Sequence, residues 1–286
     1  MLKMEQAIIC RDLKKQLGNF TLDYQEFSVA QGTVHGLIGA NGSGKTTTLK
    51  LLLGLLRQDA GEVTVLGSTN IGLDDQTRNS IGFMVEDAGI PSMLNPTELG
   101  RVFQGLYANW DASYYQQLLR QFHLDPKKPY RKCSRGMKVK VQLAIALSHR
   151  SKLLILDEPT SGLDPVSRDE IITLLSRYSE DEDHTILISS HITSDLEKLC
   201  DYVTFLEDGK IRLSSEKDEL LERYRLVQIP STRIADIEPN AIKGRRDGQF
   251  QSEFLMRSED VPQFGEVCRV TLEQIIIMLS VGGDWS

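Results

Sequence analysis

Long hydrophobic runs are missing from this sequence. No uninterrupted apolar stretch reaches the roughly 18 residues that a membrane-spanning helix needs, so we do not expect the chain to cross a bilayer by itself. The first 16 residues, MLKMEQAIICRDLKKQ, also lack the apolar core of a secretion signal. Any role at a membrane is therefore expected to come through a partner.

Excess basic charge and clustered cysteines are missing as well. The formal net charge is −7, with no basic tail, so nucleic acid is not expected as the main partner. The cysteines stand far apart, without the spacing of a metal site, at Cys10, Cys133, Cys200 and Cys268. This scatter predicts free thiols in a reducing compartment.

The composition that remains is that of an ordinary globular protein. Of 286 residues, 40% are hydrophobic and 26% are charged, which is enough apolar material for a large core. A chain of this length is expected to form one large domain and a smaller one.

Residues 39–47 read GANGSGKTT, which fits the phosphate-loop pattern G-x-x-x-x-G-K-[ST]. An apolar run (34–38) precedes the loop and a helix-like run (49–56) follows it, as this motif requires. The glycines allow a tight turn whose N–H groups point at phosphate oxygens, at the positive end of a helix. The Lys45 side chain is expected to reach the β- and γ-phosphates, and the Thr46 hydroxyl to bind Mg²⁺.

Strand-like and helix-like segments alternate along most of the chain. Short stretches between residues 5 and 34 predict antiparallel strands, and 61–67 and 81–85 predict further strands. Helical patterns cover 91–130, 137–149 and 166–178, with strands at 153–156 and 185–189 between or after them. This alternation predicts an α/β fold with a parallel core sheet covered by helices.

The character of the chain changes after residue 218. A short helix (220–224), two strand-like runs (225–229 and 250–256) and a final helix (272–279) predict a small α+β appendage. We therefore expect two domains, residues 1–218 and 219–286. A polar, glycine-bearing stretch (243–248) lies between the two strand-like runs.

Two carboxylates follow the aliphatic run Leu153–Leu156. A buried strand would deliver Asp157 to the carboxyl edge of the sheet, where it can hold Mg²⁺. Glu158 would then project towards the γ-phosphate and orient or deprotonate the attacking water. Alone, such a pair is a common solvated strand end; after a phosphate loop it indicates catalysis.

Residues 157–164, DEPTSGLD, resemble the magnesium-and-base segment and the D-loop of ATP-binding cassette (ABC) ATPases. Ser189-Ser190-His191 is similar to the segment of this family that carries its switch histidine. The resemblance covers about residues 5–215, with the motifs in the order of the family. It implies a P-loop NTPase of the ABC type with an N-terminal antiparallel part and a helical subdomain at about 88–148. It also implies that His191 contacts the γ-phosphate.

The signature segment departs from the family. Where relatives have L-S-G-G-Q, this chain has Cys133-Ser134-Arg135-Gly136-Met137. Ser134 and Gly136 are expected to contact the γ-phosphate that is bound on a second subunit, as is Asp164 of the D-loop. Arg135 either supplies a cation near that phosphoryl group or simply points outwards, and we favour the second interpretation.

Two further positions differ. Most relatives have a glutamine where this chain has Glu86, and a carboxylate there is expected to bind a metal-held water. Leu17 occupies the place of the usual adenine-stacking aromatic, with Phe20 as a substitute three residues later. The residues expected to contact nucleotide are Gly39, Asn41, Gly42, Ser43, Gly44, Lys45, Thr46, Thr47, Leu17 and Phe20.

The resemblance implies that two cassettes sandwich two ATP molecules with Mg²⁺, and that hydrolysis releases them. The partners are a second nucleotide-binding domain and a separate membrane permease, which would hold the chain at the cytoplasmic face of the membrane. The arrangement is similar to bacterial exporters of peptides, antimicrobials or lipids. A weakly hydrolysing regulatory cassette and a soluble, non-transport ABC ATPase are the alternatives.

Overall fold

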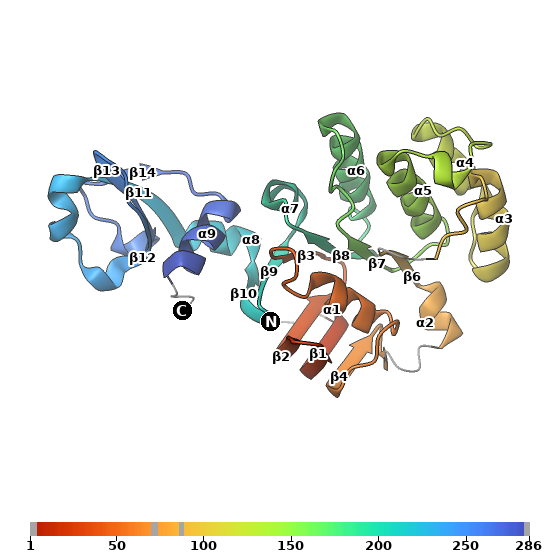
Figure 1. The fold of residues 1–286 in the computed structure, drawn as a ribbon, viewed down its shortest axis with the longest axis horizontal. Coiled ribbons are helices and arrows are strands. Elements are labelled where there is room, and N and C mark those ends of the chain that lie inside the picture. Colours follow the sequence, from red (N-terminus) through yellow and green to blue (C-terminus); the bar gives the residue numbers. More distant parts are fainter. Residues whose placement is uncertain (1–4, 70–73, 86–88, 283–286) are drawn as a thin grey trace.

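Three β-sheets and their helices make up the chain in the computed structural model, which describes residues 5–69, 74–85 and 89–282. The central sheet lies in the middle of the molecule, with the N-terminal sheet below it in Figure 1 and helices above it. The third sheet belongs to the C-terminal segment at the left of the view. All four cysteines are free thiols, as predicted.

The central sheet has the strand order β10-β9-β3-β8-β7-β6. All its neighbouring strands are parallel except β9 and β10. Its strands are β3 (Val34–Ile38), β6 (Ile81–Met84), β7 (Leu153–Asp157), β8 (Thr185–Ser190), β9 (Tyr202–Glu207) and β10 (Lys210–Glu216). Alternate residues of β7 enter different cores: Leu153 and Ile155 on one face, Leu154 and Leu156 on the other. An unbroken apolar run is what a strand buried on both faces requires.

The N-terminal sheet covers one face of the central sheet through helix α1 (Lys45–Leu52). Leucines of α1 pack in one core with side chains of β1, β2 and β4 and with the near face of β3, β7 and β8. The sheet is antiparallel, in the order β2-β1-β4-β5. Its strands are β1 (Gln6–Leu17), β2 (Phe20–Ala30), β4 (Ala60–Val65) and β5 (Ser68–Thr69). The predicted antiparallel strands are confirmed, with 20–22 and 27–29 lying on the same strand.

Helices cover the opposite face (Figure 1). They are α3 (Pro96–Leu106), α4 (Ala112–Gln121), α5 (Arg135–Leu147), α6 (Pro165–Tyr178) and α7 (Thr193–Leu199), with the 3₁₀ turn η2 (Tyr130–Lys132). The short helix α2 (Asp75–Asn79) precedes β6 and lies below it in Figure 1. The predicted start of α3 is confirmed, because Asn95 and Glu98 form a reciprocal capping box ahead of Pro96. Helix α5 begins at Arg135, two residues before the predicted start, because the Ser134 hydroxyl accepts from Met137 N.

The C-terminal segment has a sheet of its own, in the order β12-β13-β11-β14. Its elements are α8 (Lys217–Arg223), β11 (Tyr224–Pro230), η3 (Ser231–Asp236), η4 (Pro239–Ala241), β12 (Ile242–Arg246), β13 (Gln251–Arg257), η5 (Ser258–Asp260), β14 (Glu266–Cys268) and α9 (Leu272–Gly282). Strand β12 covers most of the polar stretch 243–248, which the sequence did not predict as a strand. Gly244 lets α9 approach this strand: a Cβ there would lie 2.6 Å from Met278 O.

Helix α9 attaches the C-terminal segment to the rest of the chain. Leu272 N at its start donates to Glu197 Oε2 of α7 at 3.0 Å, and Lys217 Nζ donates to Glu197 O at 3.0 Å. Buried side chains of α7 and α9 belong to one continuous apolar cluster. The appendage therefore shares part of its core with the first 218 residues.

Candidate nucleotide-binding site

The loop between β3 and α1 has a backbone that only glycine allows at three positions. Gly42 and Gly44 have φ values of 85° and 112°, in the left-handed region. A Cβ at Gly39 would lie 2.4 Å from Ser43 Oγ and 2.6 Å from Leu206 O. The loop is consequently wound tightly enough to present its backbone to a ligand, as the sequence motif predicts.

Lys45 is the first residue of α1 and arches back over this loop. Its Nζ donates to Gly39 O at 2.7 Å and to Ala40 O at 3.3 Å. The residue is only 6% exposed, so its charge is held close to the loop. The first N–H groups of a helix have no intrahelical acceptor, and together with this ammonium they form an anion-binding environment.

Ser43 supplies an independent indication that the loop binds a ligand. Its hydroxyl is buried and has no hydrogen-bond partner among the described residues. Buried polar groups are normally paired, and a phosphate oxygen is an acceptor that would satisfy this one. The donors of the loop therefore fit a phosphate chain.

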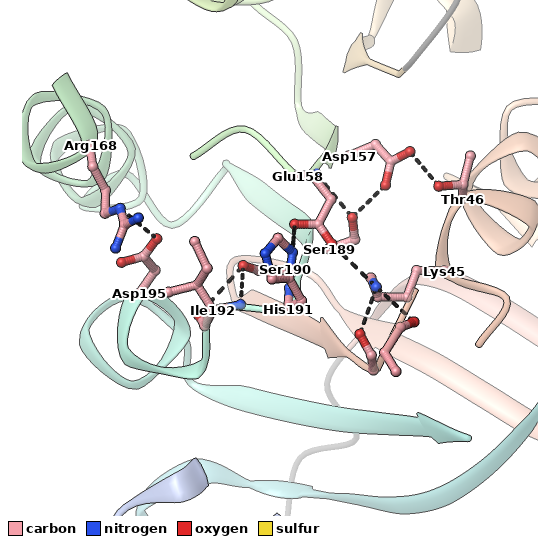
Figure 2. Close-up of polar contacts among 12 residues, drawn as sticks. Lys45, Thr46, Asp157, Glu158, Arg168, Ser189, Ser190, His191, Ile192 and Asp195 are labelled. Atoms are coloured by element: carbon pink, nitrogen blue, oxygen red, sulfur yellow. Dashed lines mark hydrogen bonds and ion pairs between the residues drawn. The ribbon is translucent and has the colours of Figure 1, made fainter. Parts of the chain in front are cut away.

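Thr46, Asp157 and Ser189 form a chain of hydrogen bonds across the ends of α1, β7 and β8. Thr46 Oγ1 donates to Asp157 Oδ2 at 2.7 Å, and Ser189 Oγ donates to Asp157 Oδ1 at 2.5 Å (Figure 2). Hydroxyl and carboxylate oxygens are the ligands that Mg²⁺ prefers. This group of oxygens next to the phosphate loop fits a magnesium ion.

Glu158 turns sharply away from the end of β7. Its φ of 50° is in the left-handed region, which is unusual for a glutamate and is found most often at functional sites. The backbone N–H donates to Ser189 O and Ser189 Oγ at 3.1 and 3.0 Å and so holds the turn. Glu158 Oε1 lies 3.2 Å from Lys45 Nζ as an ion pair (Figure 2). This oxygen is buried without a hydrogen bond from the described residues, so it is free to accept one from a bound group.

His191 contacts the other oxygen of the same carboxylate. Its Nδ1 lies 2.7 Å from Glu158 Oε2 (Figure 2). The imidazole follows the end of β8 and is 42% exposed. A turn in which Ile192 N donates to Ser190 Oγ at 2.9 Å fixes this loop. The three predicted catalytic groups, Lys45, Glu158 and His191, therefore form one connected cluster.

Leu17 and Phe20 flank the tight turn between β1 and β2. Leu17 is 41% exposed, and the Phe20 ring lies over Gly44, where a Cβ would meet its Cζ at 3.1 Å. The aromatic ring is thus in contact with the phosphate loop. This is an arrangement in which Phe20 offers a nucleobase its apolar surface.

A single cavity of about 1220 Å³ gathers most of the predicted residues. Of those predicted, Leu17, Phe20, Asn41, Gly42, Gly44, Lys45, Thr46, Thr47, Arg135, Asp157, Glu158 and His191 line it. Tyr130, Lys138 and Gln142 also line it and were not predicted. Gly39 and Ser43 belong to the same loop but do not line the cavity, and Glu86 lies outside the described residues.

The signature residues and the D-loop residue Asp164 lie at the starts of two helices. Ser134 and Asp164 are exposed and cap α5 and α6: Asp164 accepts from Ser167 N at 3.0 Å, which lowers its pKa below the ordinary value. Neither these two residues nor Gly136 lines the cavity. Arg135 is exposed, and it lines the cavity of its own chain with its guanidinium beside Gly162.

Comparisons with known proteins agree with this geometry. The ABC transporter family profile matches residues 22–161. The bacitracin transport ATP-binding protein BcrA of Bacillus licheniformis is 34% identical over 226 residues, covering 78% of this chain and 74% of BcrA. The lantibiotic transport ATP-binding protein SrtF of Streptococcus pyogenes is 35% identical over 211 residues, covering 73% of this chain and 90% of SrtF. The chain belongs to the ABC transporter family.

The fold of this ABC ATPase also matches a solved cassette. The dimeric post-hydrolysis structure of the ATP-binding cassette MJ0796, bound to ADP and Pi, aligns with a TM-score of 0.64 at 20% identity, covering 73% of this chain and 98% of that one. The predicted P-loop NTPase fold of the ABC type is confirmed, as is the prediction of an ATP-binding, ATP-hydrolysing subunit. In the described part of the ABC ATPase, no helix has both the length and the apolar character needed to cross a bilayer.

Sequence reasoning gave no role to Ser189 in this ABC ATPase site. It contacts Asp157 through its hydroxyl and Glu158 through both its hydroxyl and its carbonyl. The only signal in the sequence was its place at the end of a strand, two residues before His191. Its neutral side chain belongs to no general catalytic pattern, so only the pairing of β7 with β8 reveals the contact.

Proposed function

We propose that this chain is the motor subunit of an exporter. It would power the export of a peptide, antimicrobial or lipid-like substrate through a separate permease, at the cytoplasmic face of the membrane. The observation that carries the proposal is the cluster of Lys45, Asp157, Glu158 and His191 against the phosphate loop. The names of BcrA and SrtF, which refer to bacitracin and lantibiotic transport, support the choice of cargo class.

The phosphate loop would hold the triphosphate of ATP. Backbone N–H groups of the loop, the Ser43 hydroxyl and the Lys45 ammonium supply the donors. Thr46 and Asp157 would hold Mg²⁺, with Glu86 near a metal-held water, and Ser189 orients Asp157 through its hydrogen bond. When bound, Mg²⁺ supplies positive charge that offsets the charge developing on the phosphate oxygens. Leu17 and Phe20 would contact the base.

Glu158 would act as the general base. Glu158 lines the cavity, and its Oε1 lies beside Lys45 without a hydrogen-bond partner among the described residues, so the carboxylate can accept a proton from an attacking water. His191 holds the other carboxylate oxygen and would contact the γ-phosphate. An incoming phosphate would draw Lys45 away from Glu158, because a triphosphate carries more negative charge than one carboxylate. Nucleotide entry would thereby release the base.

A second cassette would complete the site. Ser134, Gly136 and Asp164 do not line the cavity of their own chain, so they are available to the triphosphate held by another copy. The Ser134 hydroxyl and the start of α5 offer donors to such an anion. We propose that two cassettes, either identical or related, close around two ATP molecules, and that hydrolysis separates them.

Other parts of the chain would serve the transporter. The helical subdomain, about 88–148, would receive the permease, and the accessory domain, 219–286, would extend the cassette. One alternative, a weakly hydrolysing regulatory cassette, draws on Arg135, Met137 and Glu86, and the other is a soluble non-transport ATPase. The connected cluster around Glu158 favours turnover over the regulatory role.

Steady-state ATP hydrolysis by the wild type and by Glu158→Gln tests the proposal. We expect the variant to lose activity by about 100-fold or more, because the amide cannot take up a proton. Glu207→Gln is the matched control, since Glu207 pairs with Arg212 away from the cavity and its loss should leave hydrolysis unchanged. A wild type that hydrolyses ATP no faster than Glu158→Gln would contradict the motor role. Purification from membranes with the wild type should recover an integral membrane protein; ribosomal proteins instead would favour the soluble role.

A further inference from the structure

Helices α6 and α7 begin directly after two loops of the proposed site. Helix α6 starts at Pro165, next to the D-loop residue Asp164, and α7 starts at Thr193, two residues after His191. Any contact between the first turns of these helices therefore fixes the distance between the two loops. Such a contact exists between Arg168 of α6 and Asp195 of α7.

Asp195 is a buried carboxylate with a single ion-pair partner in the described part of the chain. The residue is 4% exposed, and its Oδ2 lies 3.8 Å from Arg168 Nε (Figure 2). Neither of these two atoms makes a hydrogen bond with the described residues. Asp195 N donates to Ile192 O at 3.2 Å, which ties the carboxylate to the loop that carries His191.

Stability alone is a poor explanation for this pair. A buried ion pair is costly to desolvate, and apolar residues of similar volume often stabilise a fold at least as well. The cost is highest when the geometry is not that of a direct hydrogen bond, as at 3.8 Å. The two side chains also line a groove of about 540 Å³ between α6 and α7, so they do not fill a packed core.

We propose that Arg168 and Asp195 are positioning residues. They hold the D-loop and the switch-histidine loop at a fixed distance and orientation relative to each other. The inference rests on the proposed function of the site. Through Asp195, the pair fixes the first turn of α7 and the turn at Ser190–Ile192, and hence the His191 ring against Glu158. Through Arg168, it fixes the first turn of α6 and hence the D-loop at Asp164. Neither side chain lines the nucleotide cavity, so neither touches the substrate.

The test uses the full chain and four variants: Arg168→Gln, Asp195→Asn, the double variant, and Asp195→Glu. We expect kcat for ATP hydrolysis to fall about tenfold or more in the first three, because small misplacements of catalytic groups are costly. The KM for ATP should change by less than about twofold, since the phosphate loop is untouched. Asp195→Glu keeps the charge and should recover most of the lost kcat.

The double variant separates positioning from charge burial. It removes both charges, so no unpaired buried charge threatens the fold, and thermal unfolding checks that it remains folded. If the pair only neutralises a buried charge, the double variant will regain wild-type kcat, and the inference fails. If the pair positions the loops, the double variant will stay as slow as the slower single variant.

Arg212→Gln provides the matched control. Arg212 pairs with Glu207 at 3.0 Å on the β9–β10 hairpin, with a side-chain exposure of 37% against 34% for Arg168. Pair variants that hydrolyse ATP as fast as this control would overturn the inference while leaving the proposed function intact. A wild type without ATP hydrolysis would overturn both.

Discussion

At the scale of single residues, His35 is an uncharged histidine in the interior of the sheet that carries the phosphate loop. It is 3% exposed, and its Nε2 lies 2.7 Å from Thr204 Oγ1, which in turn contacts Ser214 Oγ at 2.7 Å. Phe27 and Tyr202 enclose the ring. Burial lowers the pKa of His35 from 6.5 to about 4, because the imidazolium would lose its hydration.

This pKa predicts how stability depends on pH. Above pH 6.5 the imidazole is neutral in both the folded and the unfolded chain. Between pH 6.5 and about 4, His35 is protonated in the unfolded chain but stays neutral in the folded chain. The free energy of unfolding therefore falls as the pH falls. The expected loss from His35 is about 1.4 kcal/mol per pH unit in that window.

Urea unfolding of the wild type and of His35→Gln between pH 7.5 and 4.5 measures this contribution. The glutamine does not titrate, so its free energy of unfolding should fall less steeply below pH 6.5 than that of the wild type. Carboxylates and the other histidines titrate in both proteins and cancel in the difference between the two slopes. Parallel slopes would show that His35 titrates alike in the folded and unfolded states.

Contiguous motifs explain which site residues were predictable. Lys45, Asp157, Glu158 and His191 each sit in a short segment whose residue types serve one chemistry, so sequence alone suggested them. Structure adds Ser189 and the pair Arg168–Asp195, because their contacts depend on which strands and helices become neighbours. Arg135 is exposed, and its place in the wall of the cavity of its own chain follows from the docking of α5 and was not predicted.

At the scale of elements, the close packing of α5 on β6 depends on Gly82. A Cβ at this position would lie 2.4 Å from Ala146 O and 2.6 Å from Leu154 Cδ2. The first is a backbone atom of α5, which cannot move without shifting the helix, and the second belongs to a core side chain of β7. The Gly82→Ala variant is therefore expected to lose about 1–3 kcal/mol of unfolding free energy through overpacking.

Gly105 in α3 offers a matched control for the same substitution. An added Cβ there meets no atom within 4 Å, and the residue is exposed near the end of a helix. Gly105→Ala should be neutral or stabilising by up to about 1 kcal/mol, since alanine favours the helix. Chemical denaturation of the Gly82→Ala and Gly105→Ala variants measures the two changes in unfolding free energy. Equal effects would mean that the approach of α5 to β6 is looser than the backbone distances indicate.

Periodicity predicted the elements that are buried on a regular face. Strand β7 and helix α6 were predicted close to their observed bounds. The apolar residues of β7 form an unbroken run, and those of α6 recur at the spacing of a helix. Strand β12 was not predicted because it is a polar edge strand, with two arginines and a glycine among five residues. The β9–β10 hairpin was not predicted, although β9 is strongly apolar and Asp208-Gly209 is a strong hairpin signal.

At the scale of the whole molecule, the boundary expected at residue 218 falls inside an element. Helix α8 runs from Lys217 to Arg223 and joins the central sheet to the C-terminal sheet, at the left of Figure 1. The change in sequence character marks where the second sheet begins, but it says nothing of packing across the boundary. That packing is extensive, because one apolar cluster contains side chains of α6, α7, α8, β11 and α9.

A shared core predicts that the two parts unfold together. Calorimetry of the whole chain should show one cooperative transition, since losing the C-terminal segment would expose the apolar face of α7 to water. Leu199→Ala on α7 and Ile275→Ala on α9 remove buried side chains from opposite sides of this contact, at about 3 kcal/mol each. Both variants are expected to lower the temperature of the same single transition. Two separate transitions, with each variant moving only one, would instead mean that the appendage folds independently and that its contact with α7 is a weak docking surface.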